Sequence, residues 1–171
     1  VSIDNKRERF QQMLSLVRGM EPIPTAVAHP CDKESLKGPV IAFHEGIIEP
    51  ILVGPESRIR GVAEEFGIDL HGIRIVNAKH SHDAAAIAVS LVRTGDAEAL
   101  MKGSLHTDEL MAEVVARANG LRTARRISHV FLMNVPTYHR PLLITDAAIN
   151  IAPTLEDKVD IVQNAIDLAH I

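Results

Sequence analysis

Cysteine is almost absent from this sequence, and so are long apolar runs. Cys31 is the single cysteine, so no disulfide can form within the chain, and a reducing, cytoplasmic setting fits best. No stretch approaches the roughly 18–20 apolar residues of a membrane helix, and the polar residues 1–10 do not form a signal peptide. We therefore expect a cytoplasmic protein without a membrane partner.

An excess of basic residues is also lacking. The formal net charge is −4, and the Lys and Arg residues are scattered among Asp and Glu rather than gathered in a stripe. This distribution argues against a nucleic-acid partner. A small, densely charged ligand stays compatible with it, because helix N-termini and a few local cations bind anions within acidic proteins.

Several motifs of nucleotide and metal sites are missing. The sequence contains no Walker A loop, no G-x-G-x-x-G fingerprint, no Cys pair and no H-E-x-x-H helix. His80 and His82 stand at a spacing that metal ligands use, but no third ligand is evident. We expect no metal, and we expect these histidines to cap the following helix or to contact an anion.

Short apolar segments alternate with amphipathic ones through the first 120 residues. This alternation predicts βαβ units and a mainly parallel sheet covered on both faces, a three-layer αβα arrangement of the α/β class. The predicted strands are 25–28, 50–53, 73–76 and 97–101, and the predicted helices are 6–18, one ending near 46, one ending at 67, 83–93 and 107–118.

The pattern changes after Gly120. Residues 122–126 form a basic linker, and 127–134 and 141–145 are two successive strands with no helix between them, so we expect an antiparallel pair or the start of a different sheet. A final helix begins with Thr154 and Asp157 at capping-box spacing. Its apolar side chains share one face: Leu155, Val159, Val162 and Ile166.

We place a domain boundary near residue 124. Residues 1–124 are then a first α/β domain, and 125–171 are the start of a second one. The sequence begins at Val1 without Met and stops at Ile171 directly after an amphipathic helix. We therefore expect a fragment, with the remainder of the second domain absent.

Polar residues follow the predicted strands, at the sheet edge where parallel sheets bind ligands. His29 follows the first strand, and Lys102–Thr107 follows the fourth. In that loop Gly103 permits close backbone approach, Ser104 and Thr107 offer hydroxyls, and the next helix presents free N–H groups. These features predict an anion site; the alternative is that Gly103 is only a turn glycine and Thr107 only an N-cap.

Polar residues also follow the strand at 141–145. Asp146 and Asn150 could orient a ligand there, and an Asx turn is the equally weighted alternative. Arg122, Arg125 and Arg126 could receive a phosphate, although a solvated linker is the commoner meaning of such a run. His129 alternates with apolar neighbours, which favours a hydrogen-bonded sheet residue over a base.

Four stretches carry a family resemblance, in the same order and spacing. They are Leu-Met-Lys-Gly-Ser-Leu-His-Thr-Asp-Glu-Leu at 100–110, Arg-Arg-Ile-Ser-His-Val-Phe-Leu-Met at 125–133, Pro-Leu-Leu-Ile-Thr-Asp-Ala-Ala-Ile-Asn at 141–150 with Ala-Pro at 152–153, and Pro-Ile-Leu-Val-Gly-Pro at 50–55. Together they resemble the phosphate acetyl/butyryltransferase family. The most similar variety has this unit after an enoyl-CoA hydratase domain in one polypeptide.

The resemblance implies a two-domain architecture like that of the isocitrate and isopropylmalate dehydrogenases, here truncated, with the active site between domains and usually a homodimer. It implies transfer of an acyl group between CoA and inorganic phosphate, with acyl phosphate, phosphate and CoA as small-molecule substrates and with no metal or bound cofactor. By resemblance, Ser104, His106 and Thr107 match the family's cleft-lining loop. Together with the strand-end residues named above, the predicted substrate-binding residues are Lys102, Gly103, Ser104, His106, Thr107, Asp146 and Asn150.

The resemblance places the family's catalytic Asp and Ser in a second half that this sequence lacks, so we expect the chain alone to be inactive. Glu109–Val114 also lacks an Arg that some family members carry. An oxidoreductase of the related fold would need metal-binding carboxylates and a nicotinamide loop, which we do not find. A non-catalytic anion-binding, CoA-ligand-binding or interaction module of the same fold is the alternative function.

Overall fold

The computed structural model describes residues 4–135 and 137–170. Within these ranges no helix is both long enough and apolar enough to cross a membrane. The described residues divide into two compact units: residues 16–122 form one, and the residues up to Ser15 together with those from Thr123 onward form the other. Helix α1 (Asp4–Val17) runs across the division between them.

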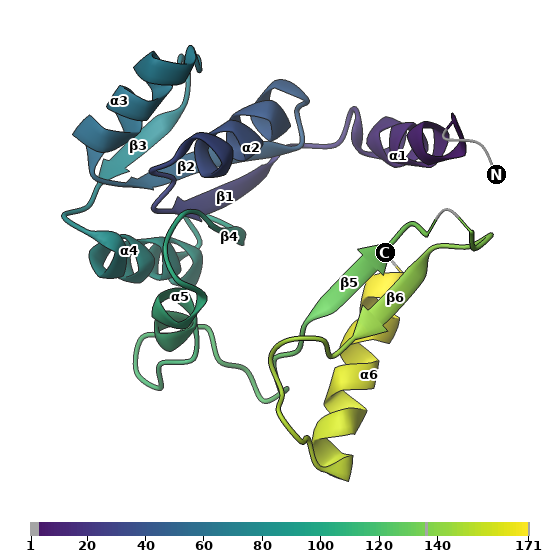
Figure 1. Cartoon of the computed structure of the whole chain (residues 1–171). Coiled ribbons are helices and arrows are strands. Elements are labelled where there is room, and N and C mark those ends of the chain that lie inside the picture. Colours follow the sequence, from purple (N-terminus) through teal and green to yellow (C-terminus); the bar gives the residue numbers. More distant parts are fainter. Residues whose placement is uncertain (1–3, 136, 171) are drawn as a thin grey trace. The chain divides into compact units, whose positions relative to one another are not determined.

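In the unit of residues 16–122, strands and helices alternate along the chain. The four strands pair in parallel in the order β3-β2-β1-β4 (Figure 1). The expected α/β class and parallel sheet are confirmed. The elements are β1 (Ile23–Ala28), α2 (Lys33–His44), β2 (Ile48–Gly54), α3 (Glu56–Phe66), β3 (Arg74–Asn77), α4 (Ser81–Thr94), β4 (Ala99–Lys102) and α5 (Thr107–Val114).

Helices cover both faces of this sheet (Figure 1). Because successive strand residues point to opposite faces, Ala26 and Ala28 of β1 join one apolar cluster while Val27 joins the other. The first cluster contains small side chains of α4, which let that helix approach the sheet closely: Ala84, Ala85 and Ala88. The second is filled by α2 and α3 through Leu36, Ile59 and Ala63.

The strand order contains a reversal between β1 and β4. From β1 the chain moves outward to β2 and β3, then returns across the sheet to place β4 on the free side of β1. The loops after β1 and β4 therefore leave in opposite directions. Open α/β sheets bind ligands in the crevice outside the carboxyl ends of two such strands. The register sets Ala28 opposite Lys102 at this end.

Helix α5 is shorter than the sequence predicts. It ends at Val114 rather than near Ala118. The chain then turns: the Gly120 amide donates to the Ala116 carbonyl at 3.1 Å, and the Leu121 amide donates to the Val114 carbonyl at 2.8 Å. The second bond occupies the Val114 carbonyl, which in a continued helix would accept from the Ala118 amide, so the helical pattern stops one turn early.

In the other unit, two strands form an antiparallel pair, as expected. They are β5 (Val130–Met133) and β6 (Leu142–Thr145), and α6 (Leu155–Ala169) packs against β6 (Figure 1). The predicted capping box of α6 is present, because Thr154 Oγ1 accepts from the Asp157 amide at 3.2 Å and Asp157 Oδ2 accepts from the Thr154 amide at 3.0 Å.

The predicted apolar face of α6 is not the face that packs within the described residues. Leu155 is 81% exposed and Val159 64% exposed, whereas Ile161 is 4% exposed. The packed side carries the polar residues that bind the segment before β5, so contact with that segment, rather than apolar periodicity alone, sets the rotation of the helix. The exposed apolar side is Leu155, Val159, Val162 and Ile166.

The capping box gives a direct stability test. Thr154→Ala removes the acceptor for the Asp157 amide, so the free energy of unfolding should fall by about 1 kcal/mol, the usual worth of an N-cap. Thr154→Ser keeps the hydroxyl and should stay within a few tenths of a kcal/mol of the parent. Urea unfolding followed by circular dichroism measures both. Equal losses in the two variants would contradict the capping role.

Candidate functional site

The carboxyl ends of β1 and β4 are joined by a compact set of hydrogen bonds. The Gly103 amide donates to the Ala28 carbonyl at 2.8 Å, and the Ser104 amide donates to the His29 carbonyl at 2.9 Å. Ser104 Oγ lies 2.8 Å from the His29 carbonyl oxygen and 3.1 Å from His29 Nδ1. It also accepts from the Cys31 amide at 3.2 Å. Ser104 thus links both strand ends at the reversal.

Gly103 lies where no side chain fits. A Cβ at this position would stand 2.4 Å from the Ala28 carbonyl oxygen and 2.6 Å from that of His29. The sequence indicated close backbone approach at Gly103, and the structure shows that the approaching backbone is the end of β1. The glycine therefore holds the two strand ends together.

His29 and Cys31 lie deep in this corner. His29 is 8% exposed and has φ of 54°, in the left-handed region that few residues other than glycine adopt. Burial lowers the pKa of His29, and Arg58 lowers it further, while Glu109 and Asp32 act in the opposite direction. Burial also raises the pKa of the Cys31 thiol to about 11, so this thiol stays protonated at neutral pH.

The loop from Lys102 to Thr107 leads into α5. His106, rather than Thr107, is the N-cap, and its side chain makes no capping hydrogen bond. The first-turn amides of α5 therefore keep their free donors, and Thr107 stands exposed beside them. Lys102 Nζ donates to the carbonyls of Gly103 and Leu105, at 3.2 and 2.9 Å, and so braces the loop.

The two histidines at the start of α4 have separate roles. His80 is the N-cap of α4, and its Nδ1 accepts from the Asp83 amide at 3.2 Å. This confirms for His80 the expectation that it caps the following helix. His82 Nε2 lies 3.3 Å from Glu109 Oε1, while Glu109 Oε2 is buried without a hydrogen-bond partner. Among residues 4–135 and 137–170, no group of three or more His, Cys, Asp or Glu residues could hold a metal ion.

In the other unit, Asp146 organises the turn after β6. Its carboxylate accepts from the amides of His129, Ala148, Ile149 and Asn150, and from the Asn150 side chain. Burial opposes ionisation, but the bonds from Asn150 and from these amides outweigh it and lower the pKa of Asp146 to about 2. The bonding corresponds to the Asx-turn alternative. Asn150 in turn donates to the Ile127 carbonyl.

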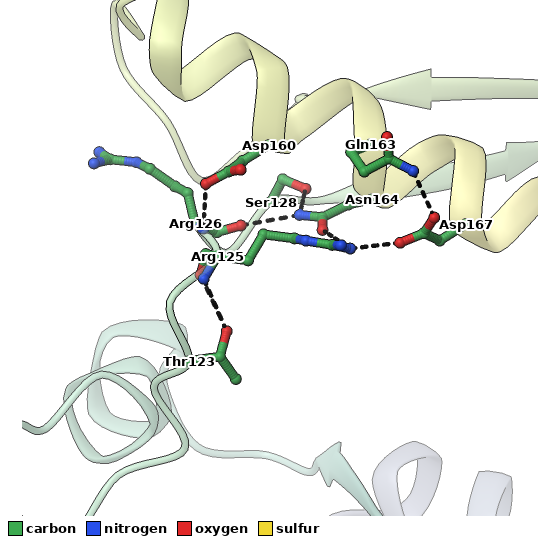
Figure 2. Close-up of polar contacts among 8 residues, drawn as sticks. All are labelled: Thr123, Arg125, Arg126, Ser128, Asp160, Gln163, Asn164 and Asp167. Atoms are coloured by element: carbon green, nitrogen blue, oxygen red, sulfur yellow. Dashed lines mark hydrogen bonds and ion pairs between the residues drawn. The ribbon is translucent and has the colours of Figure 1, made fainter.

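Two of the three arginines of the predicted linker, Arg125 and Arg126, bond to α6 (Figure 2). Arg125 Nη1 lies 2.5 Å from Asp167 Oδ2, and the Arg126 amide donates to Asp160 Oδ2 at 2.8 Å. Arg126 Nη1 also lies 3.2 Å from Asp157 Oδ1. Carboxylates of α6 thus pair with Arg125 and Arg126, two of the three cations that the sequence offered to a phosphate.

His129, directly before β5, makes contacts that support the local structure. Its amide donates to Asp146 Oδ1, and its carbonyl accepts from Thr145 Oγ1 at 2.7 Å. The ring stacks edge-on against Phe131, with centroids 4.2 Å apart. Its Nδ1 is buried without a hydrogen-bond partner in the described structure. The expectation of a hydrogen-bonded sheet residue holds for its backbone.

The sequence profile of the family described as Phosphate acetyl/butaryl transferase matches residues 80–171. This range holds α4, β4, the loop at 102–107 and all of β5, β6 and α6. It covers more than half of the chain. The chain belongs to this family.

Relatives extend the match over nearly the whole chain. A phosphate acetyltransferase from Rickettsia prowazekii is 56% identical over 168 residues, which are 98% of this chain and 48% of the relative. One from Rhizobium meliloti is 59% identical over 160 residues, 94% of this chain and 51% of the relative. The chain thus spans about half the length of the curated relatives it matches.

A solved structure supports the fold. The crystal structure of a phosphotransacetylase from Streptococcus pyogenes matches with a TM-score of 0.74 at 20% identity, over 92% of this chain and 55% of that one. At this identity the likeness concerns the fold, a parallel four-stranded sheet flanked by helices. Family membership rests on the profile.

Sequence reasoning identified the loop after β4 but did not anticipate its closest contact. His29 was noted only as a residue after the first strand, and its bond to Ser104 joins positions 75 apart in sequence. Glu109 was mentioned only as the first residue of a segment, 109–114, that lacks the Arg of some family members. The sequence did contain one signal that His29 lies near the loop: it stands before Pro30 at the end of a predicted strand, where parallel sheets place their ligands.

Gly103→Ala should strongly destabilise the protein. The added Cβ would stand 2.4 Å from a backbone oxygen, so the β1 and β4 ends must separate and lose their shared hydrogen bonds. Gly61→Ala is the matched control, because a Cβ at Gly61 meets no atom within 4 Å and alanine favours the α3 helix. In urea unfolding, Gly103→Ala should lower the urea concentration at the midpoint, and Gly61→Ala should leave it unchanged or raise it. Similar midpoints would contradict the close-approach role.

Asp146→Asn should destabilise the protein at neutral pH and lose that effect in acid. A carboxyl with a lowered pKa stabilises the fold above its unfolded pKa, near 3.9, and the stabilisation fades as pH falls through the folded pKa of about 2. Unfolding by urea between pH 2 and 7 measures the difference between variant and parent. Glu156→Gln is the control, since this exposed carboxylate receives no hydrogen bond from a described residue. A difference that stays constant with pH would contradict the assignment.

Proposed function

We propose that this chain is the N-terminal half of the catalytic unit of a phosphate acyltransferase, which moves an acetyl or short acyl group between CoA and inorganic phosphate. The observation that carries the proposal is family membership over residues 80–171, which include the β4 loop at the sheet reversal. Relatives named phosphate acetyltransferase, 56% and 59% identical, support acetyl as a substrate group.

The α5 N-terminus is the proposed position of the phosphate group. Uncapped amides follow His106, and the helix dipole places partial positive charge there. Thr107 adds an exposed hydroxyl donor at the same place. Asp108 and Glu109 weaken this field, but Glu109 is turned toward His82. Lys102, Gly103 and Ser104 support the loop by their contacts with its own backbone and with β1.

In the proposed reaction the CoA thiolate attacks the carbonyl carbon of the acyl phosphate. A carbon–sulfur bond forms, the carbon–oxygen bond to phosphate breaks, and phosphate leaves carrying the electron pair. The needs are a proton acceptor for the thiol, donors for the oxyanion and positive charge for the phosphate. Residues 102–107 are proposed to supply phosphate donors, and a second half is proposed to supply an Asp and a Ser.

Further parts of the proposal rest on the family resemblance. They are a two-domain architecture like that of the isocitrate and isopropylmalate dehydrogenases, a homodimer, a preceding enoyl-CoA hydratase domain and a cytoplasmic setting. The 48% and 51% shares of the relatives support a missing remainder. We propose that this remainder completes the second α/β domain and covers the exposed apolar side of α6, and that residues 1–171 alone are inactive.

The test is an assay of the full-length parent protein. CoA-dependent release of phosphate from acetyl, propionyl and butyryl phosphate should be observed, with one chain length preferred. No release from any of the three would overturn the proposed reaction. Tight binding of CoA or phosphate without turnover would instead favour the non-catalytic binding module.

Thr107→Ala tests the proposed phosphate contact. Loss of a hydrogen bond to a charged group costs about 1.5–3 kcal/mol, so kcat/KM for acyl phosphate should fall about tenfold to a hundredfold. Thr107→Ser keeps the hydroxyl and should retain most activity. Steady-state kinetics with varied acyl phosphate separates the two. Full activity in Thr107→Ala would remove this hydroxyl from the site.

A further inference from the structure

Glu109 stands in the first turn of α5 but does not cap that helix. It follows the N-cap His106 by three positions, where a glutamate often folds back and accepts from the N-cap amide. No described residue accepts a hydrogen bond from the amides of His106, Thr107 or Asp108. The carboxylate that could take up the free donors of α5 is therefore turned away from them.

The Glu109 side chain is held toward α4 by His82. His82 Nε2 lies 3.3 Å from Glu109 Oε1, and the two side chains are 69% and 16% exposed. This contact is an ion pair when the imidazole is protonated, and a hydrogen bond when the neutral ring carries its hydrogen on Nε2. A histidine at the surface thus fixes the direction of a carboxylate that is largely buried.

The second oxygen of Glu109 gains no bond in this position. Oε2 is sealed from solvent and has no hydrogen-bond partner among the described residues. A buried acceptor without a donor is costly, while the first-turn amides of α5 are donors without an acceptor. Folding back to those amides would remove the cost, and the helix dipole favours the same movement. The contact with His82 opposes it.

Other ionisable groups near the pair do not replace His82. Asp83 of α4 already accepts from a backbone amide, and the ring of His80 lies 6.2 Å from the ring of His82. His29, at the end of β1, also lies within the field of Glu109. Burial lowers the pKa of His29 against the effect of that carboxylate, so this ring is neutral at neutral pH. His82 is thus the group that contacts and compensates Glu109.

We propose that His82 and Glu109 together determine how tightly the α5 N-terminus binds the phosphate group of the substrate. This inference rests on the phosphate position given in the proposed function. With His82 in contact, Glu109 leaves the first-turn amides open to the anion. Without that contact, the carboxylate accepts from these amides and competes with phosphate for the same donors. His82 is a positioning residue, since it acts through Glu109.

His82→Ala in the full-length parent is the first test. KM for acetyl phosphate, and Kd for inorganic phosphate measured by calorimetry, should each rise about twofold to fivefold, the range that one charge at a helix N-terminus produces. The value of kcat should change little, because neither side chain touches the reacting atoms. His82→Arg keeps a cation within reach of Glu109 and should stay near the parent. His71→Ala, at an exposed histidine before β3, should match the parent.

Glu109→Gln tests whether His82 acts through the carboxylate. Loss of the charge should lower KM and Kd by about twofold to fivefold. His82→Ala added to Glu109→Gln should then have little further effect, because the two residues are coupled. Glu113→Gln removes a carboxylate from the other end of α5 and should match the parent. An equal effect of His82→Ala in both backgrounds would overturn the inference, since His82 would then act without Glu109.

The two measurements separate this inference from the proposed function. If the parent transfers acyl groups but His82→Ala leaves KM and Kd unchanged, the reaction stands and the inference is wrong. If the parent transfers no acyl group but its phosphate affinity follows the pattern above, the proposed reaction is wrong and the role of the pair stands. A parent that binds no inorganic phosphate and transfers no acyl group would overturn both. Thermal unfolding of each variant within a few degrees of the parent excludes misfolding as the cause of a change.

Discussion

The close approach of β1 and β4 at their carboxyl ends is the constraint on which the larger unit depends. β1 lies at the centre of the sheet, and its last carbonyls accept from the amides of Gly103 and Ser104. A side chain at Gly103 would force the two strand ends apart. Because both loops begin from this fixed point, His29 and the start of α5 are held on rigid elements, which is what a precise binding or catalytic geometry needs.

The same constraint shapes the chemistry of the corner. Packing the strand ends together buries the His29 ring and the Cys31 thiol, and burial disfavours the charged form of each. The result is a neutral imidazole and a protonated thiol beside uncapped helix amides. The proposed phosphate position relies on such backbone donors, which need no net positive charge on the chain.

The smaller unit coheres by different means. Ile161 is the single residue of α6 that is fully buried in the described structure, and Phe131 and Leu132 of β5 are about half exposed. Polar contacts stabilise this unit. Arg125 binds Asp167, and Asn164 donates to the Arg126 carbonyl (Figure 2). Asp146 accepts from the backbone amides of its turn. Arg125 and Arg126 are consequently paired with carboxylates of α6.

Local patterns determined the order of the elements. Strand and helix periodicity, the stops at Gly67 and Gly95 and the capping box at Thr154 act within a few residues, so the sequence alone predicted each described helix and strand of the sheet and of the later pair. It also identified the loop at 102–107 as the polar end of a strand. Helix ends were less determined, as in α5, because turn bonds from Leu121 decide them.

Contacts between distant segments were decided only by the tertiary structure. The pairing of β1 with β4 brings Ser104 to His29, and no local pattern encodes a bond across 75 residues. The rotation of α6 followed from its contacts with Arg125 and Arg126, which periodicity could not reveal. The sequence by itself therefore determined the elements and the family, whereas the fold decided which polar side chains meet, because long-range packing fixes their register.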